Sequence, residues 1–251
     1  MRHVYIGLPA FNEEVALPRV LARVQQLVAE TATAVTVVVY DDGSSDSTAQ
    51  IARSWRDGFE LVLIEGGTNL GLGAGLSRLV EYVAARGADD DALVVMDCDD
   101  THDPMQIVAL LQEMDAGNDV VVASRYRRGA AVIGVPLFRR ITALGAAALF
   151  KMIHPVANVW DYTCGYRLYR VGALKKAMAA FAGALVQERG FSCIAELLLK
   201  LNAAGVKFNE IPLQLRYDQK PTDSKMIVGS NARRLLILLV KWRYSGFASR
   251  S

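Results

Sequence analysis

The sequence has few cysteines and no long hydrophobic run. Its three cysteines, Cys98, Cys164 and Cys193, are an odd number at wide spacings, which excludes a disulfide framework and a zinc-binding cysteine pattern. The longest apolar stretch, 141–150, is about half the length needed to cross a bilayer. The amino terminus lacks the features of a signal peptide. We therefore expect a cytoplasmic protein that does not span a membrane.

Linkers and phosphate-binding glycine motifs are also missing. No proline- or glycine-rich linker divides the 251 residues, so we expect a single domain with a substantial core. No GxxxxGK(S/T) sequence occurs, and after Gly71 and Gly73 the third glycine of a GxGxxG motif would fall at Leu76. These absences exclude a P-loop and a dinucleotide fingerprint, and the glycines at 71–75 predict only a helix start.

The two halves of the chain carry opposite charge. Residues 1–120 contain 7 Lys and Arg against 20 Asp and Glu, and residues 121–251 contain 21 against 6. An acidic half suits metal binding, whereas a basic half suits phosphates or an anionic membrane surface. Basic residues flank the apolar stretches 141–150 and 235–240, so we expect both stretches to lie at a membrane interface without spanning it.

Strand-like and helix-like segments alternate through the first 125 residues, which predicts an α/β fold with a mostly parallel sheet flanked by helices. In this half the pattern predicts strands at 3–8, 35–40, 61–64, 93–96 and 120–123, and helices at 14–30 and 71–85. The later part predicts a mobile loop at 125–136, helices at 139–153 and 190–204, a strand at 206–215, a polar loop at 216–225 and a terminal helix at 230–244.

Pairs of carboxylates follow two of the predicted strands. Asp41 and Asp42 follow one strand, and Asp97 and Asp99 follow another. Because ligands bind at the carboxyl ends of the strands in open α/β sheets, these acids are expected at a binding edge. Residues two apart on an extended backbone point the same way, so Asp97 and Asp99 could share one divalent cation with a diphosphate.

The residues around the second pair have structural interpretations. Asp103 and Pro104 have the pattern of a helix start, with Asp103 as the N-cap. His102 is expected at the surface. Cys98 and Cys164 are expected to be small packing residues, because no histidine and aspartate partners accompany either of them.

Three strand-end motifs, in this order and spacing, resemble the GT-A (Rossmann-like) nucleotide-sugar-binding domain of family 2 glycosyltransferases. They are Pro9-Ala10-Phe11-Asn12-Glu13, Asp41-Asp42-Gly43-Ser44-Ser45-Asp46 and the DxD-like Asp97-Cys98-Asp99. Within this family the chain resembles the dolichol- or polyprenol-phosphate mannosyltransferases. That likeness rests on residues 123–126, 138–140, 161–167, 190–196, 210–212 and 224–225.

The resemblance implies a role for each matching residue. The nucleotide would be held by Pro9, Phe11, Glu13, Asp42 and Asp97. Mg²⁺ or Mn²⁺ would bind Asp97 and Asp99. The acceptor phosphate would be held by Arg125, Arg139 and Lys225, and the catalytic group would comprise Asp97, Asp99, Arg125 and Arg139.

Two positions differ from the family pattern. Thr101 stands where the family often has a glutamine after the DxD, which leaves the third protein ligand of the metal open. Gln219 stands where the family often has an arginine over the diphosphate. Lys220, Arg216 or Lys225 would have to replace that arginine.

The implied reaction moves a hexose, mannose by default, from a nucleotide sugar (GDP-mannose or a UDP-hexose) to a polyprenyl phosphate with inversion. A phosphate nucleophile is already an anion, so the enzyme needs positioning and charge neutralisation more than a base. We expect a nucleotide-sugar-binding half at 1–125, an acceptor half at 126–230 and an amphipathic helix at 231–251. The partners are a nucleotide sugar, a polyprenyl phosphate and an anionic membrane at its cytoplasmic face, and no nucleic acid.

Two alternatives remain at this point. A transferase acting on a sugar hydroxyl would need a catalytic base, and the only acids at 121–215 are Asp161, Glu188, Glu196 and Glu210. Glu188 or Asp161 would be that base. The second alternative is a non-catalytic nucleotide-sugar-binding or membrane-associated protein, which the departures at 101 and 219 favour.

Overall fold

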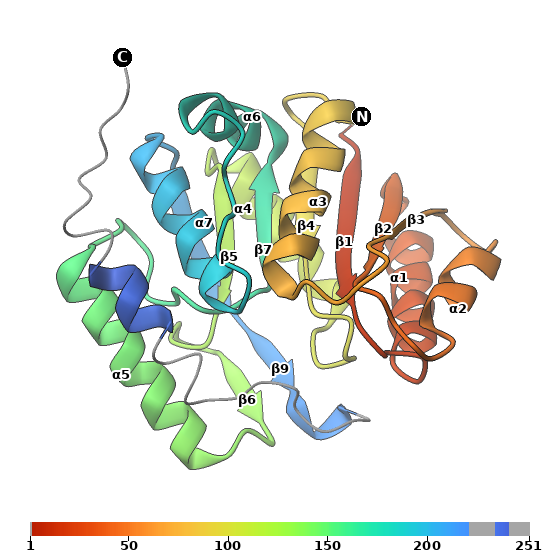
Figure 1. Cartoon of the computed structure of the whole chain (residues 1–251), viewed down its shortest axis with the longest axis horizontal. Helices are drawn as coiled ribbons and strands as arrows, with labels where there is room; N and C mark the ends of the chain where they lie inside the picture. The colour runs from red at the N-terminus through yellow and green to blue at the C-terminus, as the bar shows by residue number, and fades with distance from the viewer. Residues whose placement is uncertain (1, 221–233, 241–251) are drawn as a thin grey trace.

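A seven-stranded sheet organises the chain (Figure 1). The computed structural model describes residues 2–220 and 234–240. The strands lie in the order β3 (Glu60–Glu65), β2 (Val35–Asp41), β1 (Val4–Ala10), β4 (Ala92–Val95), β7 (Arg167–Arg170), β5 (Val120–Ser124) and β8 (Phe208–Pro212). All neighbours pair in parallel except β7, which is antiparallel to both β4 and β5.

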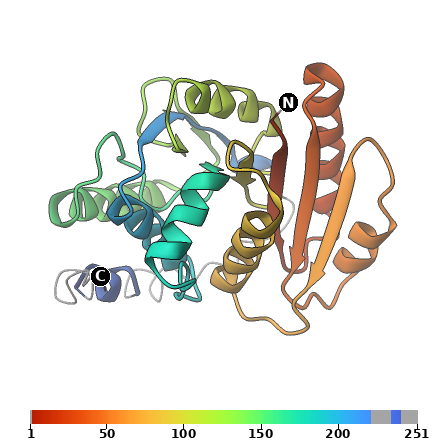
Figure 2. The same ribbon diagram turned by 90° about the horizontal axis from the view of Figure 1, so that it is seen from above.

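Helices cover both faces of this sheet (Figure 2). One face packs against α1 (Leu17–Thr31), α2 (Thr48–Ser54) and α4 (Ile107–Asp115). The other packs against α3 (Leu72–Arg86), α6 (Val171–Ala180) and α7 (Ser192–Ala203). The three-layer arrangement confirms the α/β class that the alternating pattern predicts.

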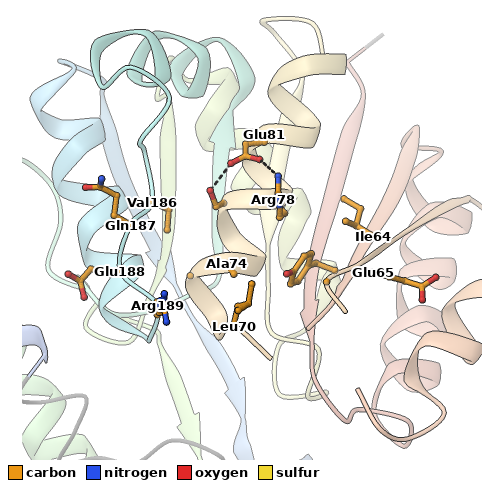
Figure 3. A pocket seen from close by; sticks show the side chains of 14 residues that line it. Ile64, Glu65, Leu70, Ala74, Arg78, Glu81, Val186, Gln187, Glu188 and Arg189 are labelled. Atoms are coloured by element: carbon orange, nitrogen blue, oxygen red, sulfur yellow. Dashed lines mark hydrogen bonds and ion pairs between the residues drawn. The ribbon is translucent and has the colours of Figure 1, made fainter. Parts of the chain in front are cut away.

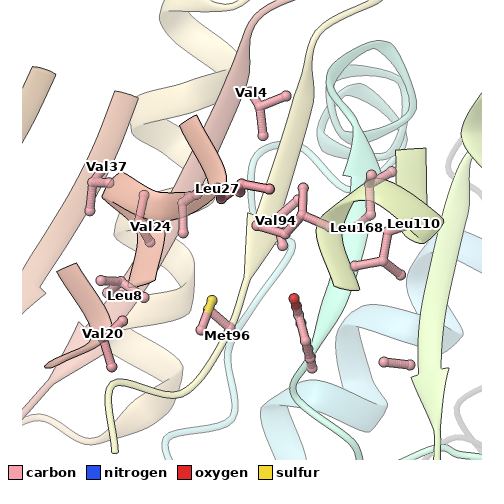
Figure 4. Packing of buried hydrophobic residues seen from close by; sticks show 14 of the residues in the cluster. Val4, Leu8, Val20, Val24, Leu27, Val37, Val94, Met96, Leu110 and Leu168 are labelled. Carbon is pink, nitrogen blue, oxygen red and sulfur yellow. The ribbon is translucent and has the colours of Figure 1, made fainter. Parts of the chain in front are cut away.

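The strands are apolar on both sides because both sides are covered. Val94 of β4 packs with Leu8 and Val24 in the core of the α1 face (Figure 4). Its neighbours Leu93 and Val95 belong to the core of the α3 face. Removing each such side chain from water contributes about 1.5–3 kcal/mol, which fixes the strands and therefore the positions of the loops at their ends.

A small second sheet corrects two sequence predictions. The segment 125–136, predicted as a mobile loop, contains β6 (Ala131–Ile133), and the predicted strand 206–215 is split into β8 and β9 (Gln214–Arg216). β6 and β9 pair in parallel. This pairing joins residues about 80 positions apart, so no local pattern reveals it. A turn of 3₁₀ helix, Tyr217–Gln219, follows β9 inside the predicted polar loop.

Helix α5 (Leu137–Ile153), predicted from residue 139, stands away from the sheet beside the helical residues 234–240 (Figure 1). The imidazole of His154 forms a hydrogen bond with the Leu239 carbonyl at 3.1 Å. Within the part of the chain that the structure describes, no helix is long and apolar enough to cross a bilayer. The rest of the predicted terminal helix lies outside the described residues.

Candidate active site

The carboxyl ends of β1, β2, β4 and β5 meet at one edge of the sheet. The segment 161–166 reaches the same edge, because β7, which follows it, runs in the opposite direction. The Ala123 N–H at the end of β5 donates to the Tyr166 carbonyl at 3.0 Å. Residues from both halves of the chain therefore meet here.

Both oxygens of the Asp99 carboxylate are held at this edge. Its Oδ1 accepts the Thr101 hydroxyl at 2.6 Å, and its Oδ2 accepts the Lys220 ammonium at 2.5 Å. Burial would raise the pKa of Asp99, but the Lys220 charge and these hydrogen bonds outweigh burial and hold the pKa below its ordinary value. Asp99 is therefore an anion paired with a cation from 121 residues further along the chain.

Asp97 lies beside this pair in a different environment. Burial raises the pKa of its carboxyl, against the opposing effect of His102. A Cβ added to Gly165 would lie 3.3 Å from Oδ1 of Asp97. The backbone that precedes β7 thus comes close to the carboxylate at a residue with no side chain.

The two carboxylates offer the donor set that a hard divalent cation prefers. Mg²⁺ and Mn²⁺ take oxygen ligands and commonly keep water and substrate phosphates in their coordination shell. The described residues contain no group of three His, Cys, Asp or Glu side chains that could hold a metal, and the Thr101 hydroxyl already donates to Asp99. The chemistry of Asp97 and Asp99 would suit a cation only if its other ligands came from diphosphate and water.

His102 is buried, so its predicted surface position is wrong. It is 3% exposed, and its ring stacks on Tyr166 with centroids 4.9 Å apart. The Asp97 N–H donates to its Nδ1 at 3.1 Å, and a β-bridge to Leu215 covers it. The imidazole shapes the turn that presents the two aspartates. By contrast, the predicted N-cap is confirmed, because Asp103 accepts the Met105 N–H at 3.1 Å.

Arg125 and Asp161 form a bidentate ion pair just after the end of β5. Nε and Nη2 of Arg125 donate to the two oxygens of Asp161 at 2.8 and 2.5 Å, and Nη2 also donates to the Thr163 hydroxyl at 2.6 Å. Burial would raise the pKa of Asp161, but the guanidinium holds it below the ordinary value. Within the described residues Nη1 of Arg125 has no hydrogen-bond partner.

A buried glutamate holds the backbone beside this pair. Oε1 of Glu210, on β8, accepts the consecutive N–H groups of Trp160 and Asp161, both at 2.7 Å. Burial raises the pKa of Glu210 above its ordinary value. The Arg127 guanidinium lies 3.8 Å from Oε2. Glu210 thus holds the loop that carries Asp161.

All four acids at 121–215 have contacts with the protein. Asp161 and Glu210 are described above, and Glu196 is 2% exposed and paired with Lys200. Glu188 accepts the Ser192 hydroxyl at 2.9 Å. Asp161, one of the two candidate bases, is therefore an anion locked to Arg125, which argues against proton abstraction by it.

The predicted nucleoside residues lie where β1 and β2 end. The carboxylate of Asp42 accepts two consecutive N–H groups, those of Leu70 and Gly71, each at 2.8 Å. Asn12, which the sequence analysis did not single out, has a left-handed backbone with φ of 52°. Its amide oxygen accepts the Ser45 N–H at 2.8 Å. This contact ties the Pro9–Glu13 motif to the β2 motif.

The three candidate replacements for the family arginine have different positions. Lys220 reaches Asp99, whereas Arg216 donates to Asp218 in an exposed pair. Lys225 lies outside the described residues. Arg139 lies in the first turn of α5, and its side chain is also outside the description, so its predicted phosphate contact stays a prediction.

Comparison with known proteins gives the family. The profile of Glycosyl transferase family 2 matches residues 5–178. The chain is 27% identical to polyprenol monophosphomannose synthase of Mycolicibacterium smegmatis, over 97% of this chain and 88% of that relative. It is 28% identical to undecaprenyl-phosphate mannosyltransferase of Micrococcus luteus, over 97% of this chain and 96% of that relative.

The architecture also matches solved structures. Glucosyl-3-phosphoglycerate synthase from Mycobacterium tuberculosis, solved in complex with UDP, superposes with a TM-score of 0.65 at 20% identity, over 96% of this chain and 79% of that one. At this identity the match shows the fold alone. The fold and the edge site define a glycosyltransferase of the GT-A type. The chain belongs to glycosyl transferase family 2, which confirms the family that the strand-end motifs predict.

The Asp161–Arg125 pair gives a stability prediction. Asp161→Asn leaves the arginine without its buried counter-charge, so chemical denaturation should show a loss of about 3–5 kcal/mol. Because the folded-state pKa of Asp161 is depressed, its contribution is present above the unfolded-state pKa of about 3.9 and is lost as the pH falls further. The gap between wild type and variant should therefore be full at pH 7 and shrink below about pH 4.

The matched control is Asp89→Asn, which removes an ion pair with Lys175 at the surface. Its cost should be about 0.5 kcal/mol or less. Equal losses for the two variants would contradict a buried pair at Asp161.

Proposed function

We propose that the protein transfers a hexose, mannose by preference, from a nucleotide sugar to a polyprenyl phosphate. The observation that supports the proposal is how the acids at 121–215 and Arg125 are paired. The four acids at 121–215 are held in contacts with the protein, whereas Nη1 of Arg125, with its two N–H hydrogens, has no hydrogen-bond partner within the described residues. Such a site suits an acceptor that is already an anion and needs no base. The names of the two relatives above support the same acceptor and sugar.

Each end of the edge has a proposed task. Pro9, Phe11, Glu13 and Asp42 hold the nucleoside, and GDP-mannose is the proposed donor, with a UDP-hexose as the alternative. Nη1 of Arg125 donates to the acceptor phosphate. Arg139 and Lys225 are its proposed companions, on the family resemblance alone. Guanidinium groups suit this task because they keep their positive charge and donate hydrogen bonds in a fixed geometry.

Asp97 and Asp99 are the proposed ligands of Mg²⁺ or Mn²⁺. When bound, the cation would neutralise charge on the departing nucleotide diphosphate. Lys220 now supplies positive charge to Asp99. A cation held by Asp99 would leave this ammonium able to donate to a diphosphate oxygen, so Lys220 is the proposed replacement for the family arginine. The acceptor oxygen then attacks the anomeric carbon from the face opposite the leaving group, with inversion.

The second candidate is a transferase acting on a sugar hydroxyl. It would need Glu188 as its catalytic base, because Asp161 is paired with Arg125. Glu188 is half-buried, and among the described residues its carboxylate accepts one hydrogen bond, from Ser192. Glu188→Gln should leave transfer to polyprenyl phosphate within about threefold of wild type. A loss of about 100-fold or more, the scale of general base catalysis, would favour the hydroxyl acceptor.

The metal proposal predicts that excess EDTA abolishes transfer and that Asp99→Asn lowers it by about 100-fold or more, because a charged ligand at the reacting diphosphate is lost. The assay is mass spectrometry of the hexosyl phosphate product, with GDP-mannose and UDP-hexoses as donors. The control is the neighbouring carboxylate in Asp100→Asn, which pairs with Arg23 and should lose less than about threefold. Full activity in excess EDTA would falsify the proposal.

The acceptor is a lipid, and α5 has the surface to meet it. Leu137, Ile141, Leu144 and Met152 follow one another at helical spacing and are each more than half exposed, as is Phe138. A row of this kind on a helix that stands away from the sheet suits the interface of a bilayer. Lys151, expected to flank it with charge, instead donates to the Val156 and Val159 carbonyls. We propose peripheral binding to the cytoplasmic face of an anionic membrane.

This surface gives a binding prediction. The protein should float with vesicles that contain phosphatidylglycerol, and rising salt should release it. The double variant Leu137→Gln and Ile141→Gln should reduce capture by about tenfold or more, because two apolar side chains no longer leave water. Val15→Gln, at an apolar residue just before α1 with 47% exposure, is the control and should change nothing. Equal capture of all three proteins would show that α5 is not the contact.

A further inference from the structure

Glu196 of α7 is a buried charge that the proposed reaction does not use. Its Oε1 pairs with the Lys200 ammonium at 2.7 Å, and its Oε2 accepts the consecutive N–H groups of Gln187 and Glu188, both at 2.8 Å. The same ammonium donates to the Ala184 carbonyl at 2.6 Å. One ion pair therefore holds a loop, residues 184–189, at three backbone groups.

That loop crosses the first turn of α3 at very short range. The Gly73 N–H donates to the Arg189 carbonyl at 3.0 Å. A Cβ on Gly73 would lie 1.7 Å from the Glu188 carbonyl oxygen, and one on Gly71 would lie 2.6 Å from that of Arg189. Backbone meets backbone here, and only glycine allows it. The glycines at 71 and 73 thus form a crossing point for a loop from the other half of the chain.

The two residues just before α3 hold the Asp42 carboxylate. The N–H groups of Leu70 and Gly71 donate to the two oxygens of Asp42, each at 2.8 Å. Asp42 is the carboxylate proposed to hold the nucleoside. The contacts run without a gap from Glu196 through the loop 184–189 and Gly71 to Asp42.

Figure 3 shows the two elements facing each other. Residues 186–189 lie on one side of α3, and Ile64 and Glu65 lie on the other; together with residues of α3 they line a cavity of about 600 Å³. The cavity also reaches Tyr40 of β2. The loop thus lies over the donor end of the edge, although it comes from residues that follow the acceptor segment 161–166 in the chain.

We propose that Glu196 is a positioning residue for the nucleotide: by fixing the loop 184–189 it fixes the first turn of α3, and with it the Asp42 carboxylate. This inference rests on the proposed function for the role of Asp42. Glu210 is the matching device on the acceptor side, since it also accepts two consecutive backbone N–H groups from a loop, those of Trp160 and Asp161.

The two glutamates make a controlled comparison. In Glu196→Gln an amide NH₂ must face either the Lys200 ammonium or the loop N–H groups, so the loop shifts. We expect the Kd of GDP or UDP, measured by calorimetry with Mg²⁺ below the unfolding temperature, to rise about tenfold. Glu210→Gln should leave this Kd within about twofold. A role limited to stability would lower the melting temperature of both variants and change neither Kd.

A second measurement uses the unaltered protein, so it does not depend on the variants folding. If the loop and the nucleotide are coupled, the coupling is reciprocal, and the nucleotide must slow hydrogen exchange at the loop. We expect the amides of Gln187 and Glu188 to exchange at least threefold more slowly with nucleotide bound, while those of Trp160 and Asp161 do not change.

The outcomes separate the two claims. Nucleotide binding by wild type together with an unchanged Kd in Glu196→Gln, or with unchanged exchange at 187–188, overturns the positioning role alone. Failure of wild type to bind either nucleotide overturns the proposed function and the positioning role together. A raised Kd in Glu196→Gln only, with slowed exchange at 187–188, supports both.

Discussion

The edge site depends on one constraint, the antiparallel strand β7 between β4 and β5. Arg167 at its start lies opposite Val95 and Val122, so residues 161–166 extend past the carboxyl ends of both neighbours. In an all-parallel sheet this segment would lie at the opposite edge. The reversed direction instead places Asp161 next to Arg125. It also places Gly165 next to the carboxylate of Asp97, a proposed ligand of the cation. The residues proposed to hold donor and acceptor thereby share one edge of a single sheet.

Charge pairing between distant parts of the chain completes the edge. The acidic first half and the basic second half meet where Lys220 pairs with Asp99, while Asp161 holds Arg125. Two buried glutamates each hold a loop by accepting two consecutive backbone N–H groups. Glu196 holds residues 187–188 at the proposed donor side, and Glu210 holds residues 160–161 at the proposed acceptor side. Because unpaired buried charges are costly, these contacts fix the loops and leave few carboxylates to act as a base.

The sequence could predict most of the sheet and the donor end of the site. Buried parallel strands are near-continuous apolar runs, so β1 and β2 can be predicted from the sequence. Carboxylates that follow such runs predict a binding edge. Strand β7 could not be predicted, because two of its four residues are arginines. The first, Arg167, is fully buried and donates to the Ile194 and Asp161 carbonyls, contacts that exist only after folding. The burial of His102 and the contacts of Glu196 with its loop likewise depend on long-range packing, which no local sequence pattern reveals.

The central claim is that the nucleophile is a phosphate that needs no base. The direct measurement gives the enzyme, with metal and donor, a polyprenyl phosphate and the polyprenol of the same length in parallel, and follows both products by mass spectrometry. The account predicts hexose transfer to the phosphate and none detectable to the alcohol, because the alcohol requires proton removal that Asp161, locked to Arg125, is not placed to provide. Comparable rates on the two acceptors would contradict it.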